Sequence, residues 1–456
     1  MTACVLLPTL LAAPPAAAQR GADAAGAPVL AIDIGRAIVP LEGPWRFHTG
    51  DDPRWANPGF DDSAWETADL TPPAGAHDPD VGLKGYVRGW GARGHRGYAG
   101  YAWYRMRVSV NAPDGATVAL AGPLEVDEAY QVFVNGRRLG GSGRFAGATP
   151  VVYNTRPEMF ALASAPLPPH GLPNGQFLIA FRVWVGPEFM REVPDGGGIR
   201  IAPAIGELGA ISAHHQLDWL AKVLGYVVEV VEAVAFVLLA VMAVSVAMFE
   251  PSKRAYRWLA AALVLIAIAR ANQAVFYWTT WESARTAILL RFVCVDPLAL
   301  GAWAMVWRTW FGVERPSWLP RTIGVLTALY VLTDLVAASS FGWASHAALA
   351  LVTPLRLLFV LTMAIIIYGS AARPGAKNWL AVAAMLLVSI GLYAQEVSAL
   401  GVPGIWFPFG VGVSRTQYAY AAFVIVAFVV LLRRLAAFAR AGLAAGISIQ
   451  RHEAFD

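Results

Sequence analysis

The chain of 456 residues is poor in cysteine and in charge. It has two cysteines, Cys4 and Cys294. Both lie in apolar runs, so the sequence predicts neither a structural disulfide nor a cysteine-based metal site. Only 14% of the residues are charged, against about 25% in a typical soluble domain, and the mean hydropathy is +0.50. These values exclude a wholly soluble enzyme, a disordered chain and a disulfide-rich secreted module.

Recognisable catalytic motifs are also lacking. The sequence contains neither a Gly-x-Ser-x-Gly elbow nor a His-Glu-x-x-His motif. The net charge of +4 comes largely from arginines beside apolar segments, which indicates membrane topology and no nucleic-acid partner. We therefore predict no enzyme activity, no cofactor and no metal site. The sequence does not decide whether the β-region binds a structural calcium ion.

The first 40 residues contain an apolar leader. It ends in Ala16-Ala17-Ala18, a small-residue cleavage pattern, and is too short and too broken by proline to span a bilayer. We interpret residues 1–18 as a signal peptide and residues 19–40 as a flexible spacer.

Residues 41–210 alternate short β-type segments with Gly, Pro, Asn and Asp. Tyr101–Val110 is rich in aromatic and β-branched residues, and Asn135-Gly136 predicts a tight hairpin turn. Many short strands with dense turns indicate an all-β sandwich.

Five segments occur in the order expected of a jelly roll: Leu41–Phe47, Phe60–Trp65, Tyr101–Arg105, Val134–Gly136 and Ala180–Val183. The region resembles the galactose-binding-like domains that accompany glycoside hydrolases. This resemblance implies an exported jelly-roll domain with carbohydrate among its candidate ligands. Trp45, Trp65 and Trp103 are expected to be core residues rather than sugar platforms.

The glycine-rich loop His77–Tyr98 is the ligand-binding candidate. Its aromatic and cationic residues suit a sugar ring, a carboxylate or a phosphate: Tyr86, Arg88, Trp90, Arg93, His95 and Tyr98. The alternative is that the loop packs against the membrane domain or lipid headgroups. Five carboxylates of this half could serve hydrolysis, but the sequence pairs no two of them across a cleft: Asp61, Asp62, Glu125, Asp127 and Glu128.

Seven apolar segments in the second half each approach the roughly 20 residues of a spanning helix. They lie near 223–248, 256–278, 287–311, 322–341, 346–369, 378–399 and 416–433. The fold class predicted is thus an all-β jelly-roll sandwich followed by an all-α seven-helix transmembrane bundle, with the membrane domain over 219–435 and a tail over 436–456.

Basic residues gather at alternate connections. The first, third, fifth and last carry them: Lys253, Arg254, Arg257, Arg308, Arg315, Arg321, Arg373, Lys377, Arg433, Arg434 and Arg440. The intervening loops are nearly free of them, Arg285 and Arg415 excepted. Because positive loops stay in the cytoplasm, the β-region is expected outside a bacterial inner membrane and the C-terminus inside.

An exported β-domain, seven helices and a cytoplasmic end resemble the bacterial seven-transmembrane receptors with diverse intracellular signalling modules. The resemblance implies a sensor that relays an extracytoplasmic small molecule or carbohydrate to a kinase, cyclase or phosphatase module, in cis or in trans. A homodimer is a further expectation. The sequence departs from the family pattern because only about 23 residues follow the seventh helix.

Ionisable residues inside the apolar segments are costly and therefore informative. They are Glu229, Glu232, Arg270, Arg291, Asp296, Asp334, Arg356 and Glu396. We select Arg270, Asp296, Asp334, Arg356 and Glu396 as coupling candidates, with Asp334–Arg356 and Arg270–Asp296 as pairs at compatible depth. A purely structural role is the alternative.

Two other functions stay open from the sequence. One is a transporter or intramembrane enzyme whose exported domain recruits substrate. The other is an adhesion or polysaccharide-tethering protein, for which seven helices are more than an anchor requires.

Overall fold

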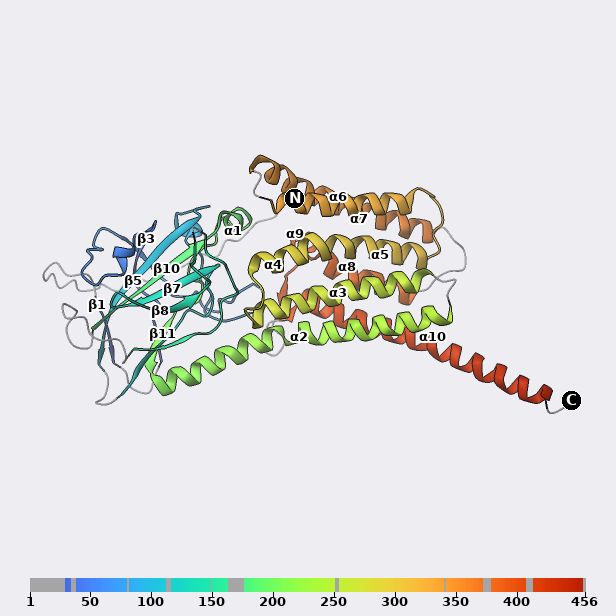
Figure 1. Ribbon diagram of the computed structural model, residues 1–456, viewed down its shortest axis with the longest axis horizontal. Coiled ribbons are helices and arrows are strands. Elements are labelled where there is room, and N and C mark those ends of the chain that lie inside the picture. The colour runs from blue at the N-terminus through green and yellow to red at the C-terminus, as the bar shows by residue number, and fades with distance from the viewer. Residues whose placement is uncertain are drawn as a thin grey trace, which may run out of the picture.

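The computed structural model describes residues 29–33, 38–79, 82–111, 116–147, 149–162, 176–250, 254–339, 342–371, 379–406 and 413–453. The predicted signal peptide lies outside these residues. The N-terminal part is β-rich with mostly antiparallel pairing, and the C-terminal part is helical (Figure 1). We refer to them as the β-domain and the helical domain.

The described residues of the β-domain form two sheets. The larger has the order β4 (Glu66–Ala68), β3 (Trp45–Thr49), β5 (Gly100–Asn111), β10 (Gln176–Val185), β7 (Ala129–Val134) and β8 (Arg137–Ser142), with β1 (Val29–Asp33) also paired to β5. The smaller has the order β2 (Val39–Pro40), β11 (Ala204–Glu207), β6 (Val118–Ala121) and β9 (Met159–Ala161). The remaining short elements are η1 (Pro53–Ala56), η2 (Gly91–Arg93) and α1 (Pro187–Glu192).

The core of the β-domain is built from both sheets. Trp45 and Phe181 of the larger sheet pack with Leu120 and Ile205 of the smaller one. Trp45, Trp65 and Trp103 are all buried, as the sequence predicted. The predicted hairpin is confirmed: it joins β7 to β8 with positive φ at Asn135 and Gly136, which asparagine and glycine tolerate.

Part of the segment interpreted as a spacer is structured. Val29–Asp33 pairs in parallel with Arg107–Asn111, and Val39–Pro40 pairs with β11. β3 pairs with only the first half of one side of β5, and the short apolar segment of β1 pairs with the backbone groups of the second half. A flexible spacer is therefore the wrong description for these residues.

Among the described residues, ten helical elements follow the β-domain. They are α2 (Leu208–Phe249), α3 (Arg254–Trp278), α4 (Ala284–Ile288), the π-helical turn η3 (Leu289–Val295), α5 (Asp296–Trp310), α6 (Leu319–Ala337), α7 (Gly342–Ala371), α8 (Trp379–Leu392), α9 (Ala394–Ala399) and α10 (Arg415–Glu453). Strands β12 (Ile405–Trp406) and β13 (Val413–Ser414) precede α10. Within the described residues, six helices are long and apolar enough to cross a membrane, counting α4, η3 and α5 as one.

The sixth predicted segment, 378–399, differs from a single spanning helix. Its described residues form α8 and α9, which are separated at Tyr393, and the apolar stretch Leu380–Leu392 is shorter than the six others. Hydropathy averages over this break and does not reveal it.

Small residues let the helices approach closely. α3 packs between α2 and α5 and buries Ala260, Ala262 and Ala267 against Trp303 of α5 and its neighbours. Since lipid is as apolar as leucine, such packing rather than hydrophobic exclusion holds spanning helices together.

The β-domain and the end of α10 lie at opposite ends of the helical domain (Figure 1). α2 begins at the residue after β11, with no linker between Glu207 and Leu208. α10 runs on to Glu453 and projects beyond the other helices.

Candidate functional site

The β-domain is fastened to the helices at a junction centred on Lys222 of α2. The Lys222 side chain is 1% exposed, its Nζ donates to the carbonyl oxygen of Thr155, and Glu125 Oε2 lies 3.7 Å away. The Thr155 hydroxyl in turn donates to the Val126 carbonyl at 3.2 Å. A buried ammonium is costly unless it is paired and hydrogen-bonded, so this lysine holds Glu125 and Thr155 of the β-domain against α2.

Aromatic stacking closes the same junction. The rings of Tyr226 and Tyr277 stack with centroids 3.8 Å apart. They form an apolar cluster with Leu83, Ile201 and Trp278. Two further hydrogen bonds cross between the domains: Ala284 N to Val152 O at 2.9 Å and Asn154 Nδ2 to Tyr277 O at 3.3 Å. The β-domain is thus packed directly on α2, α3 and α4.

The glycine-rich loop uses its largest aromatic residues inside the β-domain. Trp90 is buried against Phe47, and its Nε1 donates to the Tyr98 carbonyl at 3.2 Å. The Tyr98 hydroxyl donates to Tyr101 O at 2.7 Å and accepts from Gly50 N at 2.9 Å. These two residues build the fold, a role that the sequence pattern of aromatic and arginine residues did not reveal.

The other four candidates of the loop lie apart. Tyr86 lies under the Arg200 guanidinium at 4.5 Å, and burial raises the pKa of Tyr86 to about 12. His95 is 2.9 Å from Glu66. Arg93 is half-buried, and Arg88 is the exposed one of the six. The loop also supplies Leu83 to the junction, so one part of it does pack against the helices.

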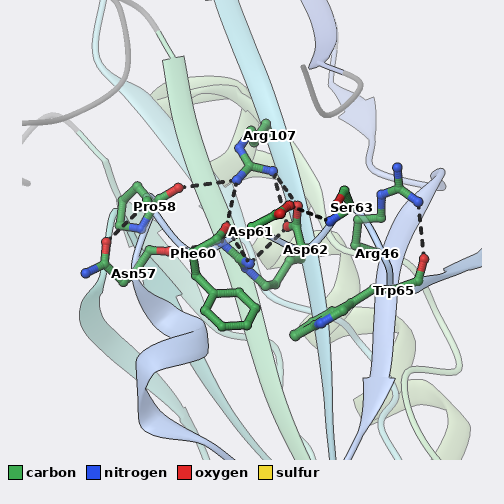
Figure 2. A network of polar contacts seen from close by, with 11 residues as sticks. Arg46, Asn57, Pro58, Phe60, Asp61, Asp62, Ser63, Trp65 and Arg107 are labelled. Atoms are coloured by element: carbon green, nitrogen blue, oxygen red, sulfur yellow. Dashed lines mark hydrogen bonds and ion pairs between the residues drawn. The ribbon is translucent and has the colours of Figure 1, made fainter. Parts of the chain in front are cut away.

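Asp61 and Asp62 have different structural roles (Figure 2). Asp62 is buried and pairs with Arg105 at 3.0 Å and Arg107 at 2.9 Å. Arg105 is fully buried beneath the rings of Phe60 and Trp65, and burial lowers its pKa to about 10. Asp61 is exposed and accepts from Ser63 N at 3.0 Å. This geometry is a buried ion-pair network and not a hydrolytic carboxylate pair.

The remaining carboxylates of the sequence set are also engaged. Asp127 Oδ2 is 2.9 Å from Arg200 Nη1 and accepts from Gly197 N at 2.6 Å. Glu128, with φ 71°, accepts a hydrogen bond from Gly186 N. Burial raises the pKa of Glu128 to about 7. Within the described residues, no three His, Cys, Asp or Glu side chains are grouped so as to hold a metal ion.

In the described part of the helical domain, two clusters of ion pairs are centred on Arg270 and Arg356. In the first, Arg270 Nη1 lies 2.6 Å from Glu229 and 4.0 Å from Glu232. Gln417 Nε2 donates to Glu229 at 3.3 Å, and the Arg270 guanidinium lies 5.2 Å from the centre of the Tyr420 ring. This cluster ties together α2, α3 and α10.

The second cluster is centred on Arg356 of α7. Its guanidinium donates to Glu396 at 2.5 and 2.8 Å and to the Tyr330 hydroxyl at 3.2 Å. It also donates to the Leu392 carbonyl at 2.9 Å. That carbonyl ends α8, so the arginine satisfies a backbone group that the break at Tyr393 leaves open.

A cavity of about 50 Å³ lies between the two clusters and is lined by groups from both. Its polar lining consists of Arg270, Arg291, Asp296, Arg356 and Tyr420. The π-helical turn η3 carries Arg291, and Asp296 follows it directly beside Pro297. Such turns often occur at functional sites in helices. We call this space the bundle cavity.

The structure corrects both predicted pairings. Arg356 pairs with Glu396 rather than Asp334, and Arg270 pairs with Glu229 rather than Asp296. Arg270, Asp296 and Arg356 nevertheless meet at the bundle cavity. Depth along a helix follows from residue count, whereas the direction in which a side chain points around the helix does not, so the partners were misassigned.

Two further residues, Lys222 and Glu232, belong to these sites although the sequence pattern does not single them out. Lys222 stands just before the first apolar segment, where a boundary lysine is common, and no local sequence pattern marks its burial. Glu232 was among the ionisable residues but was not selected. Both of its carboxylate oxygens are buried and lack a hydrogen-bond partner among the described residues.

Comparison with known proteins adds little. No family model and no curated protein matches the chain. Among solved structures, a β-glucuronidase from Bacteroides uniformis is 18% identical, with a TM-score of 0.26 over 38% of this chain and 18% of its own. A β-glycosidase from Bacteroides vulgatus is 19% identical, with a TM-score of 0.24 over 38% and 20%. The chain spans a fifth or less of these enzymes, and similarity at this level carries no argument on function.

Proposed function

We propose that the protein is a membrane signal-transduction receptor of the bacterial inner membrane. Its β-domain, a jelly roll outside the membrane, binds a small molecule or carbohydrate, and its helices relay the change to a cytoplasmic module. We count seven crossings by treating α8 and α9 as one. An odd number of crossings agrees with the β-domain and the projecting end of α10 lying at opposite ends of the helical domain (Figure 1).

The observation that carries this proposal is the direct connection between the two domains. β11 continues into α2 without a linker, and Lys222 with the Tyr226–Tyr277 stack holds the β-domain to the helices. A tethered recruiting domain would not need such a junction. A ligand that favours one arrangement of the β-domain therefore biases the helices by the difference in its binding free energy.

The charge distribution supports the orientation. Basic residues occur at the helix ends and connection that lie away from the β-domain (Figure 1): Arg254 begins α3, Arg315 lies between α5 and α6, and Arg434 lies in α10. Arg285 of α4 and Arg415 are the exceptions on the near side; Arg415 is buried and donates to the carbonyls of Ala394 and Val402. Its role is to fasten the segment before α10, so it does not count against the rule that positive loops stay inside.

A transporter or intramembrane enzyme is the second candidate, and the bundle cavity favours it. Three arginines and an aspartate around one small space in a membrane domain are unusual, because such groups are costly there. Uptake of solutes into vesicles containing the purified protein alone would support this alternative.

Distance measurements between spin labels test the receptor proposal. Labels at Arg257→Cys and Arg434→Cys report on the far ends of α3 and α10, in a chain whose Cys4 and Cys294 are replaced. We expect Lys222→Met to alter the distance distribution, because it breaks the junction, which lies about 40 Å along α2 from the end of that helix near the labels. A panel of monosaccharides, uronic acids and short oligosaccharides is then added to both proteins.

The control variant is Asp61→Asn, which changes an exposed charge of the β-domain away from the junction. It should leave the distances unchanged. If Lys222→Met also leaves them unchanged, and no compound that raises the Tm shifts them, the junction does not transmit and the receptor proposal fails.

A further inference from the structure

The first part of α2 extends beyond the other helices toward the β-domain (Figure 1). Tyr226 stacks on Tyr277, next to the last residue of α3, so this tyrosine pair marks the end of the bundle. The 18 residues before it, Leu208–Gly225, have a length of about 27 Å. We call this segment the stalk.

The stalk exposes three leucines. Leu217, Leu220 and Leu224 are 63%, 52% and 51% exposed. Leu217 lies about 14 Å beyond Tyr226 along the helix. Lipid tails cover apolar side chains inside the bundle's depth, but a leucine at that distance from the aromatic belt faces headgroups and water. These leucines therefore require an apolar protein surface to pack against.

The spacing of these leucines indicates the kind of structure that packs on them. The leucines follow the 3–4 alternation of a heptad, and the same alternation continues down α2 through further exposed residues: Val227, Val231, Val234, Leu238 and Val241. Sustained apolar residues every 3.5 positions are the seam of a left-handed coiled coil between helices. The occupant is therefore another helix that runs along α2 for about seven turns.

The opposite face of α2 is already occupied. Ile211, Lys222 and Tyr226 pack against the β-domain and α3, and Asp218 pairs with His214. The exposed seam carries no charge, and the positions that flank it in the stalk are the uncharged Gln216, Ala221 and Val223. A two-fold dimer brings each residue close to its own copy, so a charge-free seam is what self-association requires.

We propose that α2 is a dimerisation helix whose seam, from Leu217 to Val241, pairs in parallel with the same seam of a second copy. The inference is independent of the receptor proposal, because a transporter or an anchor could dimerise in the same way. Lipid would cover the lower part of the seam equally well; the stalk leucines and their heptad register favour a second copy.

A cysteine scan along the stalk tests the pairing. Single cysteines replace residues 213–224 one at a time in the full chain in native membranes, with Cys4→Ser and Cys294→Ala. Oxidation should cross-link two copies several-fold more at 217, 220 and 224 than at His215→Cys and Trp219→Cys. Cross-linking without this periodicity, or none at the three leucine positions, would overturn the proposal.

The double variant Leu217→Glu, Leu220→Glu gives a second readout in nanodiscs. The native mass should fall from dimer to monomer while the Tm reports an intact fold. Val193→Glu, at an exposed apolar residue of the β-domain, is the matched control and should remain dimeric. A wild-type chain that is monomeric at all concentrations, or a double variant that stays dimeric, would contradict pairing through this seam. If copies associate only through lipid, cross-linking in the cysteine scan would show no heptad periodicity.

Discussion

Asp61 and Asp62 are neighbours of the same chemical type, yet their surroundings make their contributions to the stability of the β-domain very different. Asp62 neutralises two guanidinium groups in the interior, whereas Asp61 accepts one backbone hydrogen bond at the surface (Figure 2). Removing the shared anion would leave Arg105 buried without its counter-charge and take one ion pair from the half-buried Arg107, which costs more than the pair itself contributes.

Asp62→Asn should therefore destabilise the β-domain by about 3 kcal/mol or more. The fall in Tm is measured by tryptophan fluorescence of the full chain in nanodiscs, since Trp65 and Trp103 lie beside the network. Asp61→Asn is the matched control and should melt close to the wild type. Equal melting of both variants would show that Asp62 is not the essential counter-ion.

Glu128 should make the β-domain pH-sensitive. Burial raises its pKa to about 7 from an ordinary 4.5, so the folded state binds the proton more tightly than the unfolded state. The protonated Glu128 contributes at most about 3 kcal/mol to the free energy of unfolding. This contribution is full below pH 4.5 and is lost as the pH rises through 7.

Melting of the wild type between pH 4.5 and 7.5 measures this contribution. Glu128→Gln, which resembles the protonated acid, should lose less stability over that interval than the wild type. Glu207→Gln, at an exposed carboxylate of β11, should retain the wild-type dependence. An unchanged slope in Glu128→Gln would assign the pH dependence to another group.

At the scale of elements, two helical glycines should respond oppositely to the same substitution. A Cβ at Gly391 of α8 would collide with the Tyr420 ring of α10, beside the bundle cavity, whereas one at Gly324 of α6 meets nothing within 4 Å. Gly391→Ala should cost about 1–3 kcal/mol through overpacking. Gly324→Ala should be neutral or stabilise by up to about 1 kcal/mol. Thermal melts in nanodiscs compare them, and a neutral Gly391→Ala would mean that α8 and α10 are not in close contact.

The elements also show what a single sequence reveals. Long apolar segments and the Asn-Gly hairpin depend on composition and local backbone preference, so they could be predicted. The break at Tyr393 and the choice of Glu396 as the partner of Arg356 depend on which side of each helix faces its neighbours. The burial of Trp90 depends on the distant Gly197, which no local pattern reveals.

For the whole molecule, the distribution of arginines predicts the orientation in the membrane. In a cysteine-free background, a membrane-impermeant maleimide should label Arg54→Cys of the β-domain in cells with a permeabilised outer membrane. Arg434→Cys should react only after the inner membrane is opened, because positive ends remain in the cytoplasm. Labelling of Arg434→Cys while the inner membrane is intact would show that the orientation is the reverse of the one predicted.

α2 is a single rod of 42 residues that is clamped near its middle by the Tyr226–Tyr277 stack. Such a rod is a lever with its fulcrum at the bundle surface, with arms of about 27 Å toward the β-domain and about 35 Å toward the other side. Below the stack α2 is tied to α3 and α10, so a tilt of about 5° imposed by the β-domain would move the far end of α2 by about 3 Å together with those helices. A small movement of the β-domain, without any rearrangement of its sheets, would thus produce a somewhat larger movement of the end of α2 at the opposite surface.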